Sequence, residues 1–428
     1  MRDPLSLRAY RAATTFMRPV ADVILERRLR AGKEDAGRIA ERRGVPGHAR
    51  PDGPLLWIHG ASVGESLSVL PLIEALMARH PHASVLVTTG TVTSARLMAE
   101  RLPPRAFHQY APLDHPAFVG AFLDAWRPDA GLFVESELWP GLIGAVRERG
   151  VPMALVNGRM SPTAFAAWRK RRSAARALLS AFSVILAQDE GNAARLSELS
   201  GRPVSSFGNL KQAAPPLVAD ASRLHRLSTA VDGRPVWLAA STHSGEEEAV
   251  LDAHARTAKR IGGLLTVIAP RHPERGGSVE ALVRAAGLSV SRRSRGDLPD
   301  PDDAVYVADT LGELGLLYRV CNVAFIGGSL VPTGGHNPLE PARLGCAILT
   351  GPHIFNFAET YAAMRTAGGS ALVRNARDLS ASLERLLLDP MTQNQMAQAA
   401  QDWSDEAASV VLNEITGALS PVLARSSC

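Results

Sequence analysis

The chain has 428 residues, 46% hydrophobic and 21% charged, a composition that excludes a disordered protein and a length that favours two domains over one core. Its three cysteines, Cys321, Cys346 and Cys428, contain no CxxC pair, which argues against a disulfide framework and predicts a reducing compartment. The net charge of +5 is concentrated near one end: residues 1–50 hold twelve Lys/Arg and six Asp/Glu, so the rest is close to neutral.

The basic segment 1–50 carries an amphipathic pattern. Apolar side chains lie roughly on one helical face, at Leu7, Tyr10, Phe16, Met17, Val20, Val23 and Ile24, whereas Arg8, Arg11, Arg18 and Arg27 interrupt the rest. This pattern suits a helix lying in the headgroup region of an anionic membrane, and we expect no nucleic-acid partner. A solvated helix packed on the body of the protein is the equal alternative. The segment contains neither an apolar run of spanning length nor a secretory signal.

From residue 55 onward, β-rich apolar runs alternate with helical patterns. The first series of predicted strands is Leu55–Ala61, Ser84–Thr89, Gly131–Glu135, Val151–Asn157, Val184–Gln188 and Val204–Gly208. Helical spacing at 66–79 and 138–149 separates some of them. This rhythm predicts a parallel sheet covered on both faces.

A second α/β series follows a polar linker near 211–222. Its predicted strands are Val236–Ala240, Leu264–Ile268, Val305–Val307, Val323–Ile326 and Ala347–Leu349, and 293–303 is predicted to be a surface loop. We therefore expect a membrane-associating segment at 1–50 and two Rossmann-like domains, at 51–212 and 213–428. Ligands of such sheets bind beyond the carboxyl ends of the strands, here in a cleft between the domains.

The first strand leads into Ser62-Val63-Gly64-Glu65, and a helix is expected to begin at about Glu65 or Ser66. A carboxylate in a first helical turn is stabilised in its charged form, as a general base requires. The alternative is an acid that only stabilises the helix. The segment is not a GxGxxG fingerprint, which disfavours a dehydrogenase.

Charged residues follow other strands of the first series. Glu135 and Glu137 stand two residues apart at a strand end, where one carboxylate could cap the next helix and the other face the cleft. Lys211 lies beside the cleft at the linker. Arg159 follows a further strand, and the basic run 169–172 could contact phosphates or be a solvated surface.

Three loops of the second domain suggest a phosphate-binding region. One is 270–275, where Arg271 could pair with a phosphate. The second is 309–314. In the third, 327–342, a glycine-rich loop leads to Pro338 at the first position of a helix, with Glu340 in its first turn.

Metal ligation is not indicated, so we expect chemistry without a metal ion. His243, His272 and His336 each stand alone in a different loop, and the chain has no HxxxH or Asp-x-Asp motif for a cation.

Taken together, these motifs resemble those of the 3-deoxy-D-manno-octulosonic acid (Kdo) transferases of lipopolysaccharide synthesis, which have the GT-B fold. The resemblance covers residues 55–365 and rests on SVGE (62–65), ESELWP (135–140), NGRMS (157–161), GNLK (208–211), PRHPER (270–275), LGEL (311–314) and GGHNPLEPA (334–342). Ser136, Gly158 and Met160 depart from the family's usual residues. The arginine-rich N-terminus departs more, which argues against a spanning helix but not against surface attachment.

The resemblance implies an inverting transfer of Kdo from CMP-Kdo to an acylated, phosphorylated lipid A precursor, without a cofactor, at the cytoplasmic face of the inner membrane. It implies that Glu65 is the general base and that Glu135 and Lys211 stabilise the transition state. The positions it assigns to CMP contacts are Pro270, Arg271, Gly312, Glu313, Leu314, Asn337, Pro338, Leu339 and Glu340.

Two other classes stay open. One is another nucleotide-sugar enzyme of this architecture, such as a sugar epimerase, which the combination of ESELWP and GGHNPLEPA disfavours. The other is a membrane-bound nucleotide-sugar-binding protein without turnover, which the presence of Glu65, Glu135 and Lys211 disfavours.

Overall fold

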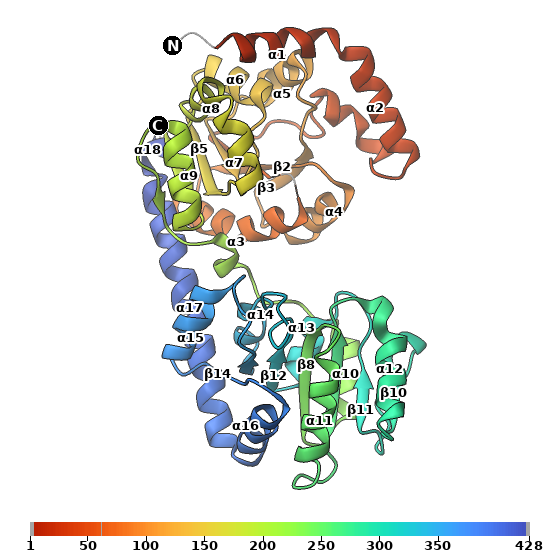
Figure 1. Ribbon diagram of the computed structural model, residues 1–428. Helices are drawn as coiled ribbons and strands as arrows, with labels where there is room; N and C mark the ends of the chain where they lie inside the picture. Colours follow the sequence, from red (N-terminus) through yellow and green to blue (C-terminus); the bar gives the residue numbers. More distant parts are fainter. Residues whose placement is uncertain (1–3, 61, 425–428) are drawn as a thin grey trace. The chain divides into compact units, whose positions relative to one another are not determined.

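Two α/β units make up the chain in the computed structural model, which describes residues 4–60 and 62–424 (Figure 1). Unit 1 comprises the described residues up to Pro215 together with those from Ala408 onward, and unit 2 is Pro216–Ala407. Ala61 and Cys428, both named above, lie outside the described residues. Each unit is built on one sheet with helices on its two faces.

Unit 1 contains a seven-stranded parallel sheet in the order β3-β2-β1-β4-β5-β6-β7. Its strands are β1 Leu55–His59, β2 Ser84–Thr89, β3 Ala106–Tyr110, β4 Ala130–Val134, β5 Met153–Gly158, β6 Val184–Ala187 and β7 Ser205–Ser206. Strand β3, at one edge, was not predicted. Its polar residues His108 and Gln109 interrupt the apolar pattern by which a buried strand is predicted, although both side chains are buried.

Helices cover both faces of this sheet. They are α3 Val63–Arg79, α4 Val92–Arg101, α5 Pro116–Trp126, α6 Pro140–Glu148, α7 Pro162–Arg169, α8 Arg172–Leu179 and α9 Glu190–Ser200. Side chains of β1 alternate between two buried clusters: Trp57 belongs to one, and Leu56 and Ile58 to the other. Every residue of β1 is fully buried, as expected for a central parallel strand.

Unit 2 repeats this plan with a parallel sheet in the order β10-β11-β9-β8-β12-β13-β14. Its strands are β8 Val236–Thr242, β9 Leu265–Pro270, β10 Val290–Arg292, β11 Val305–Val307, β12 Val323–Ile326, β13 Ala347–Thr350 and β14 Ser370–Leu372. The predicted strands are all present, whereas the three-residue edge strands β10 and β14 were not predicted. The expectation of two Rossmann-like units is confirmed.

The helices of unit 2 include the long C-terminal helix α17, which ends in unit 1. They are α10 Ala221–Ala230, α11 Glu247–Thr257, α12 Gly276–Ala285, α13 Leu314–Val320, α14 Leu339–Ala342, α15 Ala358–Thr366, α16 Ala376–Leu388 and α17 Pro390–Ala418; α18 is Ser420–Leu423. Val411, Ile415 and Leu419 belong to the same buried cluster as Ile73 of α3. The residues from 408 onward therefore pack with unit 1, whereas the expected boundary assigned them to the second domain.

The N-terminal segment forms two helices, α1 Leu5–Phe16 and α2 Arg18–Arg30, rather than one. Helix α1 lies beside α5 and α6, where Leu7 is buried and the Tyr10 hydroxyl donates to Asp114 Oδ2 at 2.8 Å (Figure 1). Leu25 of α2 is also buried. In the described part of the chain, no helix is both long and apolar enough to cross a membrane.

The opposite side of α1 and α2 leaves a group of apolar side chains exposed to solvent. This outer face consists of Phe16, Met17, Val20, Val23 and Ile24, each at least 45% exposed. The segment thus packs on the body of unit 1, as one of the two alternatives expected, and it also exposes a group of apolar side chains.

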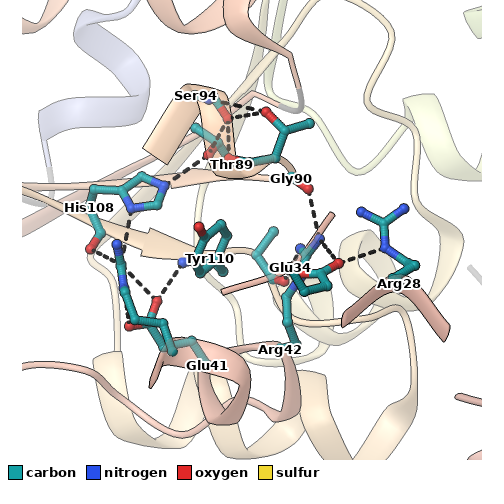
Figure 2. A network of polar contacts seen from close by, with 12 residues as sticks. Arg28, Glu34, Glu41, Arg42, Thr89, Gly90, Ser94, His108 and Tyr110 are labelled. Carbon is teal, nitrogen blue, oxygen red and sulfur yellow. Dashed lines mark hydrogen bonds and ion pairs between the residues drawn. The ribbon is translucent and has the colours of Figure 1, made fainter. Parts of the chain in front are cut away.

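A polar network fastens the next segment, the 3₁₀ helix η1 (Ala36–Arg43), to the sheet (Figure 2). Arg42 donates to both oxygens of buried Glu34 at 3.0 Å and to the carbonyl oxygens of Gly90 and Ala111. Arg38 holds Glu41, whose carboxylate accepts from the Tyr110 N–H at 2.7 Å. Residues 34–43 are therefore part of unit 1 and not a detached arm.

Candidate active site

The loop after β1 holds Glu65 in the first turn of α3, as predicted. Ser62 is the N-cap residue: its hydroxyl oxygen accepts from the Glu65 N–H at 3.3 Å, and the Glu65 carboxylate accepts from that hydroxyl at 3.0 Å. The side chain is only 8% exposed. A Cβ at Gly60 would lie 3.3 Å from Glu65 Cβ and 3.7 Å from Val134 Cβ, so glycine leaves room for the carboxylate between β1 and β4. The reciprocal bonds fix its position at the carboxyl edge of the sheet.

Glu135 and Lys211 are brought together at the same edge. Glu135 follows β4 in the left-handed region, at φ 55°, and its Oε1 lies 3.2 Å from Lys211 Nζ. The carboxylate is buried, whereas the lysine side chain is half-exposed. The two groups form an ion pair at this distance. Glu135 Oε1 nevertheless has no partner with hydrogen-bond geometry among the described residues.

Asn157, at the end of β5, places Lys211. It also has φ 55°, and its Oδ1 accepts from the Leu210 N–H at 3.1 Å, which holds the short 3₁₀ helix η2 (Leu210–Ala213) against the sheet. Asn157 was not predicted to have this role. The available signal was the residue type, because asparagine tolerates a left-handed backbone at a strand end.

Glu137 pairs with a histidine and does not cap a helix. Its Oε2 lies 3.6 Å from His59 Nε2, an ion-pair distance, and it accepts a hydrogen bond from the Trp139 indole. Burial raises the pKa of Glu137, but the contacts with His59 and Trp139 outweigh burial and keep that pKa below its usual value. Asp114 instead caps α6, accepting from the N–H groups of Gly141 and Leu142. The expectation that one of Glu135 and Glu137 could cap the next helix is therefore wrong.

In unit 2, the glycine-rich loop after β12 is held by Glu246. This fully buried carboxylate accepts from the N–H groups of Gly328, Ser329 and Leu330 at 2.7–2.9 Å. These N–H groups are consequently occupied by the protein's own carboxylate. Glu246 was not predicted as a site residue; the available signal was the run of three glutamates that begins four residues after the end of β8.

The loop 270–275 contains one structural and one exposed arginine. Arg275 pairs with both oxygens of buried Glu247, and that hydrogen bonding raises the pKa of Arg275. Pro270 ends β9, and Arg271 directly follows, its N–H donating to the Thr242 carbonyl and its side chain exposed. The structure thus leaves Arg271 at the surface of the sheet edge, as a phosphate-binding residue would require.

Glu313 is a strongly anchored carboxylate in the loop 309–314. Arg293 donates to both of its oxygens at 2.8 and 2.9 Å, which lowers the pKa of Glu313 to about 2 despite burial, and Arg223 adds a contact at 3.3 Å. Gly312 has φ 80°, a backbone that favours glycine. Leu314 begins α13.

The loop 334–342 ends in the four-residue helix α14. Pro338 stands just before that helix and not at its first position. Asn337 Oδ1 accepts from the Leu339 N–H at 3.1 Å, and Asn337 Nδ2 lies 3.4 Å from Glu340 Oε1. Burial raises the pKa of Glu340, which opposes its charge.

The three histidines predicted to stand alone are neighbours. His243 and His336 stack with their rings 8° from parallel, and their Nε2 atoms lie 2.8 Å apart. His272 stands edge-on to His243 at 5.9 Å. Burial lowers the pKa of His336 to about 4 and also lowers the pKa of His243, so both rings are neutral at pH 7. Within residues 4–60 and 62–424, no three His, Cys, Asp or Glu side chains form a metal-binding group.

The structure therefore groups the predicted residues by unit. Glu65, Glu135 and Lys211 lie at the carboxyl edge of the sheet of unit 1. The loops 270–275, 309–314 and 334–342 belong to unit 2 and follow its strands β9, β11 and β12. Arg159 and the run 169–172 are exposed.

The chain is similar to known sugar transferases. A family model described as 3-deoxy-D-manno-octulosonic-acid transferase (kdotransferase) matches residues 37–214. The 3-deoxy-D-manno-octulosonic acid transferase of Rickettsia bellii is 35% identical over 384 residues, which cover 90% of this chain and 91% of the relative. The enzyme of that name from Haemophilus influenzae is 34% identical, with 90% of each chain covered.

Solved structures resemble the chain in fold. A glycosyltransferase from Rickettsia africae has a TM-score of 0.57 at 11% identity, covering 87% of this chain and 99% of that one. UDP-GlcNAc 2-epimerase from Neisseria meningitidis has a TM-score of 0.53 at 16% identity, covering 84% and 100%. At these identities the likeness concerns architecture alone, and it confirms the predicted GT-B fold.

Proposed function

The chain belongs to the family of Kdo transferases and is a glycosyltransferase, and from this premise we propose that it moves Kdo from CMP-Kdo to an acylated, phosphorylated lipid A precursor. The observation that carries the proposal is Glu65, a nearly buried carboxylate held by Ser62 at the edge of the sheet. In this reaction Glu65 accepts the proton of the acceptor's sugar hydroxyl. The oxygen so activated attacks the anomeric carbon, and the bond to the CMP phosphate breaks with inversion.

The remaining site residues have supporting roles in this proposal. The Glu135–Lys211 pair stabilises charge that develops in the transition state, with the lysine as the exposed partner. In unit 2, Arg271 binds the donor phosphate. Pro270, Gly312, Glu313, Leu314, Asn337, Pro338, Leu339 and Glu340 surround the rest of CMP.

The same proposal places the protein on the cytoplasmic face of the inner membrane, attached at the surface. The support is the outer face of α1 and α2, where apolar side chains are exposed beside arginines. Such a face binds anionic lipid by apolar burial and by charge.

The test supplies CMP-Kdo and a tetra-acylated lipid A precursor and follows transfer with and without a chelator. We expect transfer that the chelator does not affect. Glu65→Gln should lower the rate by about 10²–10⁴-fold, the contribution typical of a general base, while CMP binding stays intact. Glu74→Gln, an exposed carboxylate on the same helix, is the matched control. A transfer rate for Glu65→Gln equal to that of the parent would contradict the mechanism. Loss of transfer by the parent in the presence of the chelator would contradict it too.

A further inference from the structure

A cavity of about 320 Å³ lies in unit 1, at the carboxyl ends of β1, β2 and β3, where α2 forms part of its wall. Ile24 and Arg28 come from α2, His59 ends β1, and residues 111–114 follow β3. Its volume is in the range of small-molecule sites. None of the functional assignments made above uses it.

The surface that lines the cavity is largely apolar. Most of the charged groups in the wall already have partners within the protein. Arg42 is held by Glu34 and by two carbonyl oxygens, and Asp114 accepts from Tyr10 and from two N–H groups of α6. Glu137 contacts His59 and Trp139. These groups have little capacity left for a polar ligand, so the walls offer mainly aliphatic surface.

Arg28 is the exception. Its Nε donates to Glu34 at 2.6 Å, but neither Nη donates a hydrogen bond to any residue that the structure describes. Figure 2 shows this guanidinium at the end of the network, with both Nη atoms directed away from Glu34. The side chain is 38% exposed, so the Nη atoms can pair with an anion.

The ligand that matches these features has an apolar chain and an anionic group. Ile24 lines the cavity and is also 45% exposed on the outer face of α2, so an acyl chain can reach the cavity from that face. The inner wall includes His59, the last residue of the strand that precedes Glu65, and Glu137, which lies two residues after Glu135.

We propose that this cavity binds one acyl chain of the acceptor lipid and that Arg28 pairs with the lipid's anionic group. The inference rests on the proposed function for the identity of the lipid. It makes α2 a part of the acceptor site in addition to a membrane contact.

The test measures binding of dodecyl phosphate, below its micelle concentration, to the full chain by calorimetry. We expect saturable binding and none of butyl phosphate. Ile24→Asp should weaken binding by at least about tenfold, because a carboxylate enters the cavity beside Arg28. Val20→Asp, on the same helix, equally exposed and outside the cavity, should bind within about twofold of the parent. Arg28→Gln should weaken dodecyl phosphate about tenfold but leave uncharged dodecyl maltoside unchanged; Arg30→Gln is its control.

Equal losses in Ile24→Asp and Val20→Asp would show adsorption to the outer face and overturn the proposal, as would a lack of saturable binding. The transfer assay separates this result from the proposed function. Transfer without dodecyl phosphate binding refutes only the cavity, whereas binding without transfer refutes only the assigned reaction.

Discussion

Glu135 combines two costs that a purely structural residue would avoid. Its left-handed backbone is unfavourable for a non-glycine residue by about 1–2 kcal/mol, and its carboxylate is buried. The ion pair with Lys211 offsets part of the second cost. Strain and buried charge at one strand end are typical of a functional position.

Lys211→Met tests this pair. Removing the ammonium leaves a buried carboxylate without its ion-pair partner and removes positive charge from the site, so we expect transfer to fall by at least about tenfold. Affinity for CMP should stay at the parental value, because Lys211 belongs to unit 1. Lys259→Met, an exposed lysine of unit 2, is the control. A parental rate for Lys211→Met would remove the lysine from the mechanism.

At the scale of secondary-structure elements, edge strand β3 is held to its neighbours by buried polar contacts. Arg38 donates to His108 Nδ1 at 3.1 Å, so that nitrogen is an acceptor and the proton lies on Nε2, which donates to Thr89 Oγ1 at 2.8 Å (Figure 2). Burial, together with Arg38 and Arg42, lowers the pKa of His108 from 6.5 to about 3. The neutral ring is thus required by the fold.

This shift predicts acid sensitivity of unit 1. Because the folded pKa lies below the unfolded value, the unfolded chain binds the extra proton, and stability is lost as pH falls from about 6.5 towards 3. We expect the free energy of unfolding in urea to fall by about 1–2 kcal/mol between pH 6.5 and 5 through this residue. His108→Gln should show a correspondingly flatter dependence; an identical slope in the variant would disprove the linkage.

The terminal part of α17 and the helix α18 complete the core of unit 1, and a substitution at Ile415 tests this role. Ile415→Ala should lower the free energy of unfolding by about 2–5 kcal/mol, since the side chain is 1% exposed within the cluster that contains Ile73. Val410→Ala, 52% exposed on the same helix, should change it by less than about 0.5 kcal/mol. Equal effects would mean that this stretch of α17 does not stabilise unit 1.

The sequence predicted helices and strands correctly where the signal lay in neighbouring residues. The central strands are continuous apolar runs, and the capping residues of α3, Ser62 and Glu65, are readable in the motif. By contrast, β3 is stabilised by residues of η1 that are distant in sequence, and Glu246 acts on a loop more than eighty residues away. Distance along the chain also explains why the His243–His336 pair was missed and why Asp114 was not predicted to cap α6.

At the scale of the whole molecule, membrane attachment is better tested by substitutions than by deleting the N-terminal segment. Deleting residues 1–50 would also remove Leu7, Leu25 and the buried Glu41, so lost binding could reflect lost folding. We expect the double variant Phe16→Ser/Val23→Ser to weaken binding to anionic vesicles by about tenfold, since two exposed apolar side chains are removed from the outer face. Leu388→Ser, a control at an exposed position of unit 2, should bind vesicles like the parent. If the double variant also bound like the parent, the outer face would be excluded as the membrane contact.

The path of α17 also has a consequence for how the protein is made. The strands of unit 1 precede unit 2 in the chain, but Val411, Ile415, Leu419 and Val422, which belong to a buried cluster of unit 1, follow unit 2. At about 5–20 residues per second, the intervening unit 2 takes roughly 10–40 s to synthesise. Throughout that interval the apolar side of α3 that these residues later cover is open to other nascent chains. The core of unit 1 is thus completed only after unit 2 has been synthesised, and chaperones have that time in which to shield it.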